Sequence, residues 1–96
     1  MVYIDGGLLK TAMELLDQDL IPRVRLYRVS RDGLRMRVLA EVSVEALQHI
    51  EGYALDLFGT GRYCAKLFST KYGRNILECR HDFIVGNPDD IEDGDF

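Results

Sequence analysis

A cluster of arginines near the start of the chain has the clearest capacity for chemistry. Six of them lie within fifteen residues, with one acidic residue between them: Arg23, Arg25, Arg28, Arg31, Arg35 and Arg37, interrupted by Asp32. Guanidinium groups bind phosphate in bidentate geometry, and aromatic rings such as Tyr27 stack on nucleic-acid bases. Further cations of a later segment extend the set: Arg62, Lys66, Lys71, Arg74 and Arg80. The alternative is a solvated sheet face on which arginines protect edge strands.

The distribution of charge favours the binding hypothesis over an acidic mimic of nucleic acid. The chain has 12 basic and 16 acidic residues, a net charge of −4. Five of the acids lie in the last eight residues, so the remaining body carries 12 basic against 11 acidic residues. A slightly basic body joined to an acidic tail is more informative than the total charge.

The acidic end of the chain has a second possible role. Its residues are Asp89, Asp90, Glu92, Asp93, Asp95 and Phe96. This ending resembles the C-terminal tips of bacterial and phage single-strand DNA-binding proteins. The resemblance implies that the tip recruits a protein partner through Phe96 and competes with DNA for the basic surface. The body departs from that family, because it lacks tryptophan and the pattern of a five-stranded OB barrel. Composition predicts a disordered segment, whose simpler role is to keep the protein soluble.

Two strand pairs are expected to position the cationic side chains. Residues 23–30 and 34–42 read as strands joined by an Arg-Asp-Gly turn, which is a strong hairpin signal. In the second strand Met36, Val38, Ala40 and Val42 alternate with more polar residues, which predicts that these four share a buried face. The first strand alternates less cleanly, because Val29 breaks the pattern. Residues 62–70 and 75–85 form the second predicted pair.

One amphipathic helix is predicted between the two strand pairs, over residues 43–58. Ser43 is a suitable N-cap, and Gly59 and Gly61 supply a C-terminal stop. Apolar residues recur at spacings of three and four along one side: Val44, Leu47, Ile50, Ala54, Leu57 and Phe58. This helix is expected to cover the sheet.

A second helix is predicted over residues 8–20, after a short strand at residues 1–5 and a break at Asp5-Gly6-Gly7. Its apolar arc includes four residues that we assign to a partner or oligomer contact: Leu9, Met13, Leu16 and Leu20. The alternative is that the arc packs on the protein's own sheet, as most amphipathic helices do.

The expected fold is therefore α+β. It consists of a small antiparallel four-stranded sheet in ββαββ order, with an additional N-terminal helix and a disordered acidic C-terminal tail. The expected organisation is an N-terminal helical segment at residues 1–22, a body at 23–86 and a tail at 87–96. A chain of 96 residues predicts one domain.

Catalytic and metal-binding patterns give little support to an enzyme. Cys64, Cys79 and His81 share one face of the second strand pair in one register, and are separated in a register shifted by one residue. We expect no metal site and no cofactor. Gly59-Thr60-Gly61 follows a predicted helix and lacks the lysine of a phosphate-binding loop. The histidines have no evident nucleophile to activate.

The sequence predicts a small non-enzymatic nucleic-acid-associated protein of phage or mobile-element origin. Six residues are expected to contact single-stranded DNA or RNA: Arg25, Tyr27, Arg28, Arg35, Arg37 and Lys66. The alternative is an oligomeric assembly or virion protein, joined through the N-terminal helix or a sheet edge. No segment matches a membrane span or signal peptide, so a cytoplasmic protein is expected, and a homo-oligomer is favoured by the small size.

Overall fold

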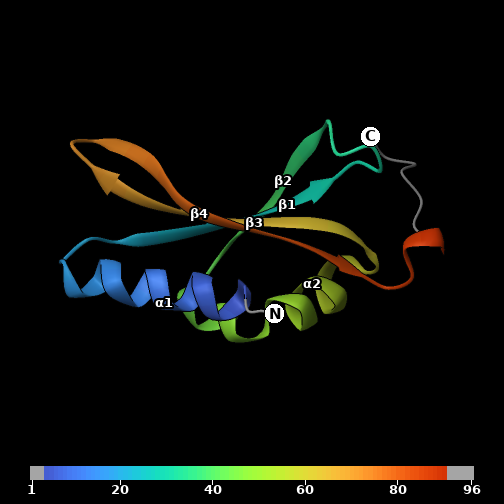
Figure 1. Cartoon of the computed structure of the whole chain (residues 1–96), viewed down its shortest axis with the longest axis horizontal. Helices are drawn as coiled ribbons and strands as arrows, with labels where there is room; N and C mark the ends of the chain where they lie inside the picture. The colour runs from blue at the N-terminus through green and yellow to red at the C-terminus, as the bar shows by residue number, and fades with distance from the viewer. Residues whose placement is uncertain (1–3, 91–96) are drawn as a thin grey trace.

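The structure, a computed structural model, describes residues 4–90 and has an α+β fold (Figure 1). Its four strands form one antiparallel sheet in the order β2-β1-β3-β4, which confirms the predicted four-stranded sheet. Along the chain the elements are α1 (Ile4–Asp17), β1 (Pro22–Val29), β2 (Met36–Val42), the 3₁₀ helix η1 (Val44–His49), α2 (Ile50–Phe58), β3 (Gly61–Lys71), β4 (Arg74–Val85) and the 3₁₀ turn η2 (Pro88–Asp90).

The helices pack on one face of the sheet, which we call the covered face (Figure 1). Leu8, Ala12 and Leu15 of α1 are buried there, together with residues from all four strands and from the second helical segment. The strand residues of this core include Val24, Leu26, Val42, Tyr63, Ala65, Leu67 and Phe83. No described helix lies over the opposite face, which we call the open face.

Strand β1 alternates strictly between the two faces. Leu26 pairs with Ala65 on the covered face, and Tyr27 pairs with Cys64 on the open face. The alternation continues to the end of the strand, so Arg28 joins Leu26 on the covered face and Val29 joins Tyr27 on the open face. The irregularity at Val29 in the sequence is therefore not a break in the strand. It marks an arginine on the helix side and a valine on the solvent side.

Strand β2 changes faces in the middle, so the prediction of one continuous apolar face is wrong. Leu26 pairs with Ala40 but Tyr27 pairs with Val38, which leaves Leu39 as an extra residue at a bulge. Ala40 and Val42 lie on the covered face. Val38 and Met36 lie on the open face, and Val38 is 56% exposed.

The predicted single helix over residues 43–58 is divided at His49 into η1 and α2. In a 3₁₀ helix residues three apart lie on the same side, so Leu47 and the following Ile50 are both buried against the sheet. Within the described part of the chain Ser43 makes no side-chain capping bond, contrary to expectation. Gly59 ends α2 with a positive φ of 84°, as predicted, and donates its N–H to the carbonyl of Leu55.

Two further expectations about the helices are wrong. Leu57, in the last turn of α2, is 59% exposed rather than buried. Helix α1 begins by Ile4, so residues 4–5 are not a strand and Asp5-Gly6-Gly7 is not a break. The intrinsic cost of glycine is about 1 kcal/mol per residue, and the packing of Leu8 and Ala12 outweighs it. Residues 1–3 lie outside the described residues.

The predicted acidic tail is described only in part. Pro88–Asp90 forms the short turn η2, where the Asp89 N–H donates to Asn87 Oδ1 at 3.0 Å. Residues 91–96, including Phe96, lie outside the described part of the chain. The expected disorder and the expected partner contact at Phe96 remain predictions.

Candidate functional site on the open sheet face

A row of charged residues crosses the open face from one edge strand to the other. Arg25 of β1 lies opposite Lys66 of β3, which in turn lies opposite Arg80 of β4. On the other side, Arg25 lies opposite Glu41 of β2. Side chains directly opposite in an antiparallel pair have Cβ atoms about 4.5–5.5 Å apart. Three like charges are therefore held side by side, an arrangement that is unfavourable without counter-charges.

Two aromatic rings flank this row, one on each side. Tyr27 lies two residues beyond Arg25 in β1, and Phe68 lies two residues beyond Lys66 in β3. Since the strands are antiparallel, the rings lie at opposite ends of the Arg25–Lys66 pair. Lys66 Nζ is 4.9 Å from the Tyr27 ring centroid, and Arg25 Cζ is 5.3 Å from the Phe68 ring centroid. Each cation leans over the ring on the neighbouring strand, which draws the two positive charges apart.

Two carboxylates neutralise part of the open face. Arg23 makes a bidentate pair with Glu41, with Nη2 2.9 Å from Oε1. Arg80 Nη2 donates to Asp82 Oδ1 at 2.7 Å. By strand register the charged residues described on this face are five cations (Arg23, Arg25, Arg62, Lys66 and Arg80) and two carboxylates (Glu41 and Asp82). Their net charge is +3, in a protein whose total charge is −4.

Cys64 lies beneath these charges and is fully buried, although it belongs to the open face. Burial raises the pKa of its thiol to about 12, and a hydrogen bond to Asp82 acts in the same direction. For Asp82, partial burial raises the pKa of the carboxyl group. The hydrogen bonds from Arg80 and Cys64 outweigh that effect, and the net shift is downward. The Asp82 carboxylate therefore accepts hydrogen bonds both from the Cys64 thiol and from Arg80.

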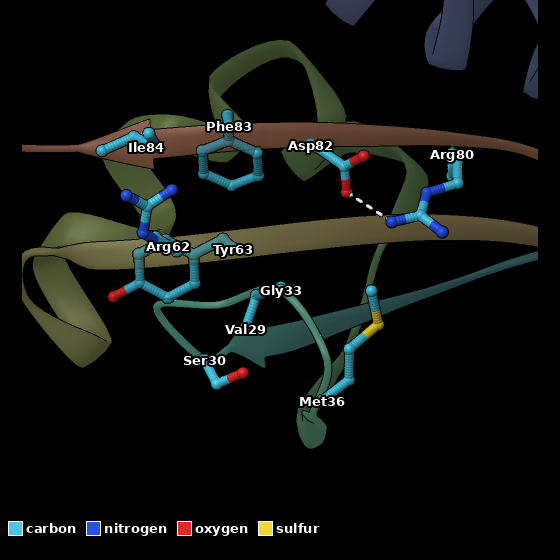
Figure 2. A pocket seen from close by; sticks show the side chains of 10 residues that line it. All are labelled: Val29, Ser30, Gly33, Met36, Arg62, Tyr63, Arg80, Asp82, Phe83 and Ile84. Carbon is cyan, nitrogen blue, oxygen red and sulfur yellow. Dashed lines mark hydrogen bonds and ion pairs between the residues drawn. The ribbon is translucent and has the colours of Figure 1, made fainter. Parts of the chain in front are cut away.

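A pocket of about 320 Å³ lies where the open face meets the β1–β2 turn (Figure 2). Its walls combine apolar and charged side chains: Val29, Ser30, Gly33, Met36, Arg62, Tyr63, Arg80, Asp82, Phe83 and Ile84. Arg62 Nε is buried and has no hydrogen-bond partner among the described residues. The Arg80–Asp82 pair lies at the other end of the pocket in Figure 2. The pocket continues the cationic surface toward the turn.

Three of the six predicted nucleic-acid contacts lie together on the open face, namely Arg25, Tyr27 and Lys66. Arg28 lies on the other face, as does Arg37, with which it pairs. Arg35 precedes β2, and its backbone N–H donates to Ser30 Oγ at 3.0 Å. Strict alternation in β1 and the bulge in β2 place Arg28 and Arg37 on the helix side, away from Arg25, Tyr27 and Lys66.

Arg28 is engaged in holding the start of β3. Its Nη2 donates to the Thr60 carbonyl at 2.9 Å, and its Nη1 lies 3.3 Å from the Tyr63 hydroxyl. The guanidinium carbon is 5.2 Å from the Tyr63 ring centroid. The Tyr63 hydroxyl donates to the Gly59 carbonyl at the end of α2. Arg28 thus has a structural explanation that does not involve a ligand.

Phe68 is the open-face residue that sequence reasoning missed. It follows Lys66 by two positions in a strand, so the period of two places both side chains on one face. The cations Arg62 and Arg80 were anticipated as an extension of the patch, and the register places both on the open face.

The four residues of segment 8–20 predicted to contact a partner divide into two groups, and one of them, Leu20, lies beyond the end of α1 at Asp17. Leu9 and Leu20 are half-buried and pack against the core, whereas Met13 and Leu16 are 55% and 50% exposed. A groove of about 400 Å³ is lined by Leu9, Met13, Leu16, Ile21, Pro22, Val44, Glu45 and Gln48. The buried side of the helix packs on the protein's own sheet, and its outer side leaves an apolar surface.

The register of β3 and β4 places Cys64 on a different face of the sheet from Cys79 and His81. Cys64 lies opposite Asp82 on the open face, whereas His81 and Cys79 lie on the covered face. His81 is buried and stacks on Phe83, with ring centroids 5.2 Å apart. Within residues 4–90 no group of three or more potential metal ligands is found.

Comparisons with protein-family models, with curated proteins and with solved structures find no match to this chain. Among the residues that the structure describes, no helix has the length and apolar character needed to cross a membrane.

Proposed function

We propose that this protein is a non-enzymatic nucleic-acid-binding protein that uses the open face of its sheet. The observation that carries the proposal is the row of Arg25, Lys66 and Arg80, three cations adjacent across three strands and flanked by two aromatic rings. Phosphate is the ligand that such a row accommodates, because an anion placed between like charges relieves their repulsion. The rings of Tyr27 and Phe68 on either side of the row offer surfaces on which bases can stack.

The residues of this proposal differ from the six expected from the sequence. Arg25, Tyr27 and Lys66 are retained, and Phe68 and Arg80 are added. Arg28 is removed, because its donors are used by Thr60 and Tyr63. Arg37, which pairs with Arg28 on the covered face, and Arg35, which precedes β2, are also left out. The proposed contacts therefore come from β1, β3 and β4, and none of them comes from β2.

Binding at low salt tests this function directly. Fluorescence anisotropy with labelled single-stranded and double-stranded DNA and RNA is expected to show binding that weakens as salt is raised. A variant with Arg25→Gln, Lys66→Gln and Arg80→Gln is expected to lose most of the affinity. Lys10→Gln, an exposed cation on the helical layer, is the matched control and is expected to bind as the wild type does. Absence of binding to every probe at low salt would reject the proposal.

The apolar groove beside α1 favours a second candidate, self-association of the chain. Met13, Leu16 and Ile21 are exposed next to one another along the groove, and contiguous apolar surface of this kind is typical of protein interfaces. This surface lies on the helical layer, so both functions are compatible in one molecule. Edge strands β2 and β4 provide a second route to assembly.

Sedimentation across a range of concentrations tests self-association. The wild type is expected to form dimers or larger species, and a Met13→Glu, Leu16→Glu variant is expected to remain monomeric. Leu57→Glu, which changes an equally exposed leucine on α2, is the control. A wild type that is monomeric at every concentration rejects this candidate.

A further inference from the structure

The two rings of the open face are each covered by a cation, and this arrangement bears on the kind of nucleic acid that fits. Lys66 lies over Tyr27, and Arg25 lies over Phe68. The two cations are also each other's cross-strand neighbours. The four side chains form a local, nearly two-fold arrangement, with a cation pair in the centre and a ring at either end.

We propose that this four-residue arrangement is a site for single-stranded nucleic acid, in which bases replace the cations on Tyr27 and Phe68. The inference rests on the proposed function and specifies its ligand. As a base stacks on Tyr27, Lys66 leaves the ring and turns toward the backbone phosphates. Arg25 does the same when a base stacks on Phe68. The cations that shield the rings in the free protein become the phosphate contacts of the complex.

Magnitudes favour this exchange. A cation over an exposed ring contributes about a two- to five-fold factor to an equilibrium constant. A base stacked on an aromatic side chain contributes about a five- to 150-fold factor. The displaced cation also gains a phosphate partner, and the repulsion between Arg25 and Lys66 falls once an anion lies between them. The exchange is therefore favourable at each ring.

A duplex cannot make the same contacts with the two rings. Its bases are already stacked on their neighbours and paired, so neither ring reaches a base face. On a duplex the cations can contact phosphate only, and both rings stay covered. Single strands are therefore expected to bind more tightly than duplexes of equal length.

The spacing of the two rings sets the minimum length of an oligonucleotide that contacts both of them. Arg23 of β1 lies opposite Phe68 of β3. Tyr27 is four residues from Arg23 along β1, which is about 13 Å, and Phe68 lies on the next strand of the sheet. The Cα atoms of Tyr27 and Phe68 are therefore about 14 Å apart, which we take as the approximate spacing of their rings. Stacked nucleotides advance about 3.4 Å per step along a strand, so about four steps separate the two rings. An oligonucleotide of about five nucleotides reaches both rings, whereas one of three reaches a single ring.

The test measures the affinity of the full chain for labelled oligo(dT) and oligo(U) of three to twelve nucleotides and for mixed-sequence duplexes. The expected result is at least ten-fold tighter binding to single strands than to duplexes. The affinity is expected to rise at least ten-fold between three and six nucleotides, and more slowly thereafter. Comparison of the affinities for oligo(dT) and oligo(U) shows whether DNA or RNA is the preferred single strand.

Variants of the rings separate stacking from charge. Tyr27→Leu and Phe68→Leu are expected to lower the affinity for six nucleotides at least five-fold, to remove the rise with length, and to leave the salt dependence unchanged. Tyr27→Phe keeps the ring and is expected to bind as the wild type does. Tyr72→Leu, at a fully exposed turn position, is the aromatic control.

Two results would overturn this inference while leaving the proposed function intact. The first is equal affinity for duplexes and single strands. The second is wild-type binding by both leucine variants, shown to be folded by circular dichroism. If a leucine variant does not fold, the comparisons of length and of duplex with single strand on the wild type still decide the matter. Absence of binding to any probe rejects the proposed function itself, and this inference with it.

Discussion

The guanidinium of Arg28 occupies the space directly above Gly61, the first residue of β3. A Cβ atom at Gly61 would lie 2.3 Å from Arg28 Cζ, so only glycine leaves room for the guanidinium in this position. From there Arg28 donates to Thr60 and covers the ring of Tyr63. An arginine on the covered face is therefore made possible by a missing side chain on the next strand.

This relationship predicts a strong coupling between the two residues. Arg28→Ala is expected to lower the free energy of unfolding by about 1–2 kcal/mol, through loss of a charged hydrogen bond and of the ring contact. Gly61→Ala is expected to cost a similar amount in the wild type, because the guanidinium must leave. In the Arg28→Ala background the same change is expected to be neutral or stabilising, since alanine suits a strand better than glycine. Urea denaturation of all four proteins measures the cycle, and purely additive effects would contradict it.

Two leucines on the apolar side of the helix predicted over residues 43–58 are expected to contribute differently to stability. Leu47 is fully buried, whereas Leu57 is mostly exposed. Leu47→Ala is expected to destabilise the protein by about 2–5 kcal/mol, through lost burial and the cavity that remains. Leu57→Ala is expected to change stability by no more than about 0.5 kcal/mol. Thermal or chemical denaturation measures both, and equal effects would mean that the packing of α2 differs from that described.

The buried thiol of Cys64 predicts a loss of stability at alkaline pH. Its pKa is raised from 9.0 to about 12 in the folded protein. Between these values the unfolded chain releases the thiol proton while the folded chain keeps it, so stability falls as pH rises. The contribution is fully present below pH 9 and is lost as pH approaches 12. The difference in unfolding free energy between wild type and Cys64→Ala, measured from pH 7 to 11, is expected to decrease above pH 9.

Reactivity of the same residue provides an independent check. The thiolate is the reactive form, so Cys64 is expected to resist alkylation in the folded protein at pH 8. In denaturant both cysteines are expected to react. Rapid labelling of Cys64 in the native protein, identified by peptide mass analysis, would contradict its burial.

The salt dependence of binding predicts how many phosphates the cation row contacts. Each phosphate neutralised on a single strand contributes about −0.7 to the slope of log affinity against log salt concentration. Contacts from Arg25, Lys66 and Arg80 therefore predict a slope of about −2. Lys66→Gln is expected to reduce its magnitude by about 0.7, whereas Lys10→Gln is expected to leave it unchanged. An unchanged slope in the Lys66 variant would remove this residue from the phosphate contacts.

Signals between neighbouring residues in the sequence identified the four strands of the sheet and the two helical regions of the chain. Alternating residues and an Asp-Gly turn predicted the first hairpin, and the position of Gly59 predicted the end of α2, because these signals depend on neighbours along the chain. The same local rules placed Arg25, Tyr27 and Lys66 in strands. They also gave a basic body, which is a property of composition.

Which side chains share a surface depends on the packing of segments that are distant in the sequence. The bulge at Leu39 moved Val38 to the open face, and the space above Gly61 allowed Arg28 to lie on the covered face. The register of β3 and β4 separated Cys64 from His81 and brought Arg80 beside Lys66. Register and bulges depend on how two distant segments pack, and a shift by one residue exchanges the faces of a strand. For that reason the sequence alone identified the cations, and the paired strands selected those that lie together.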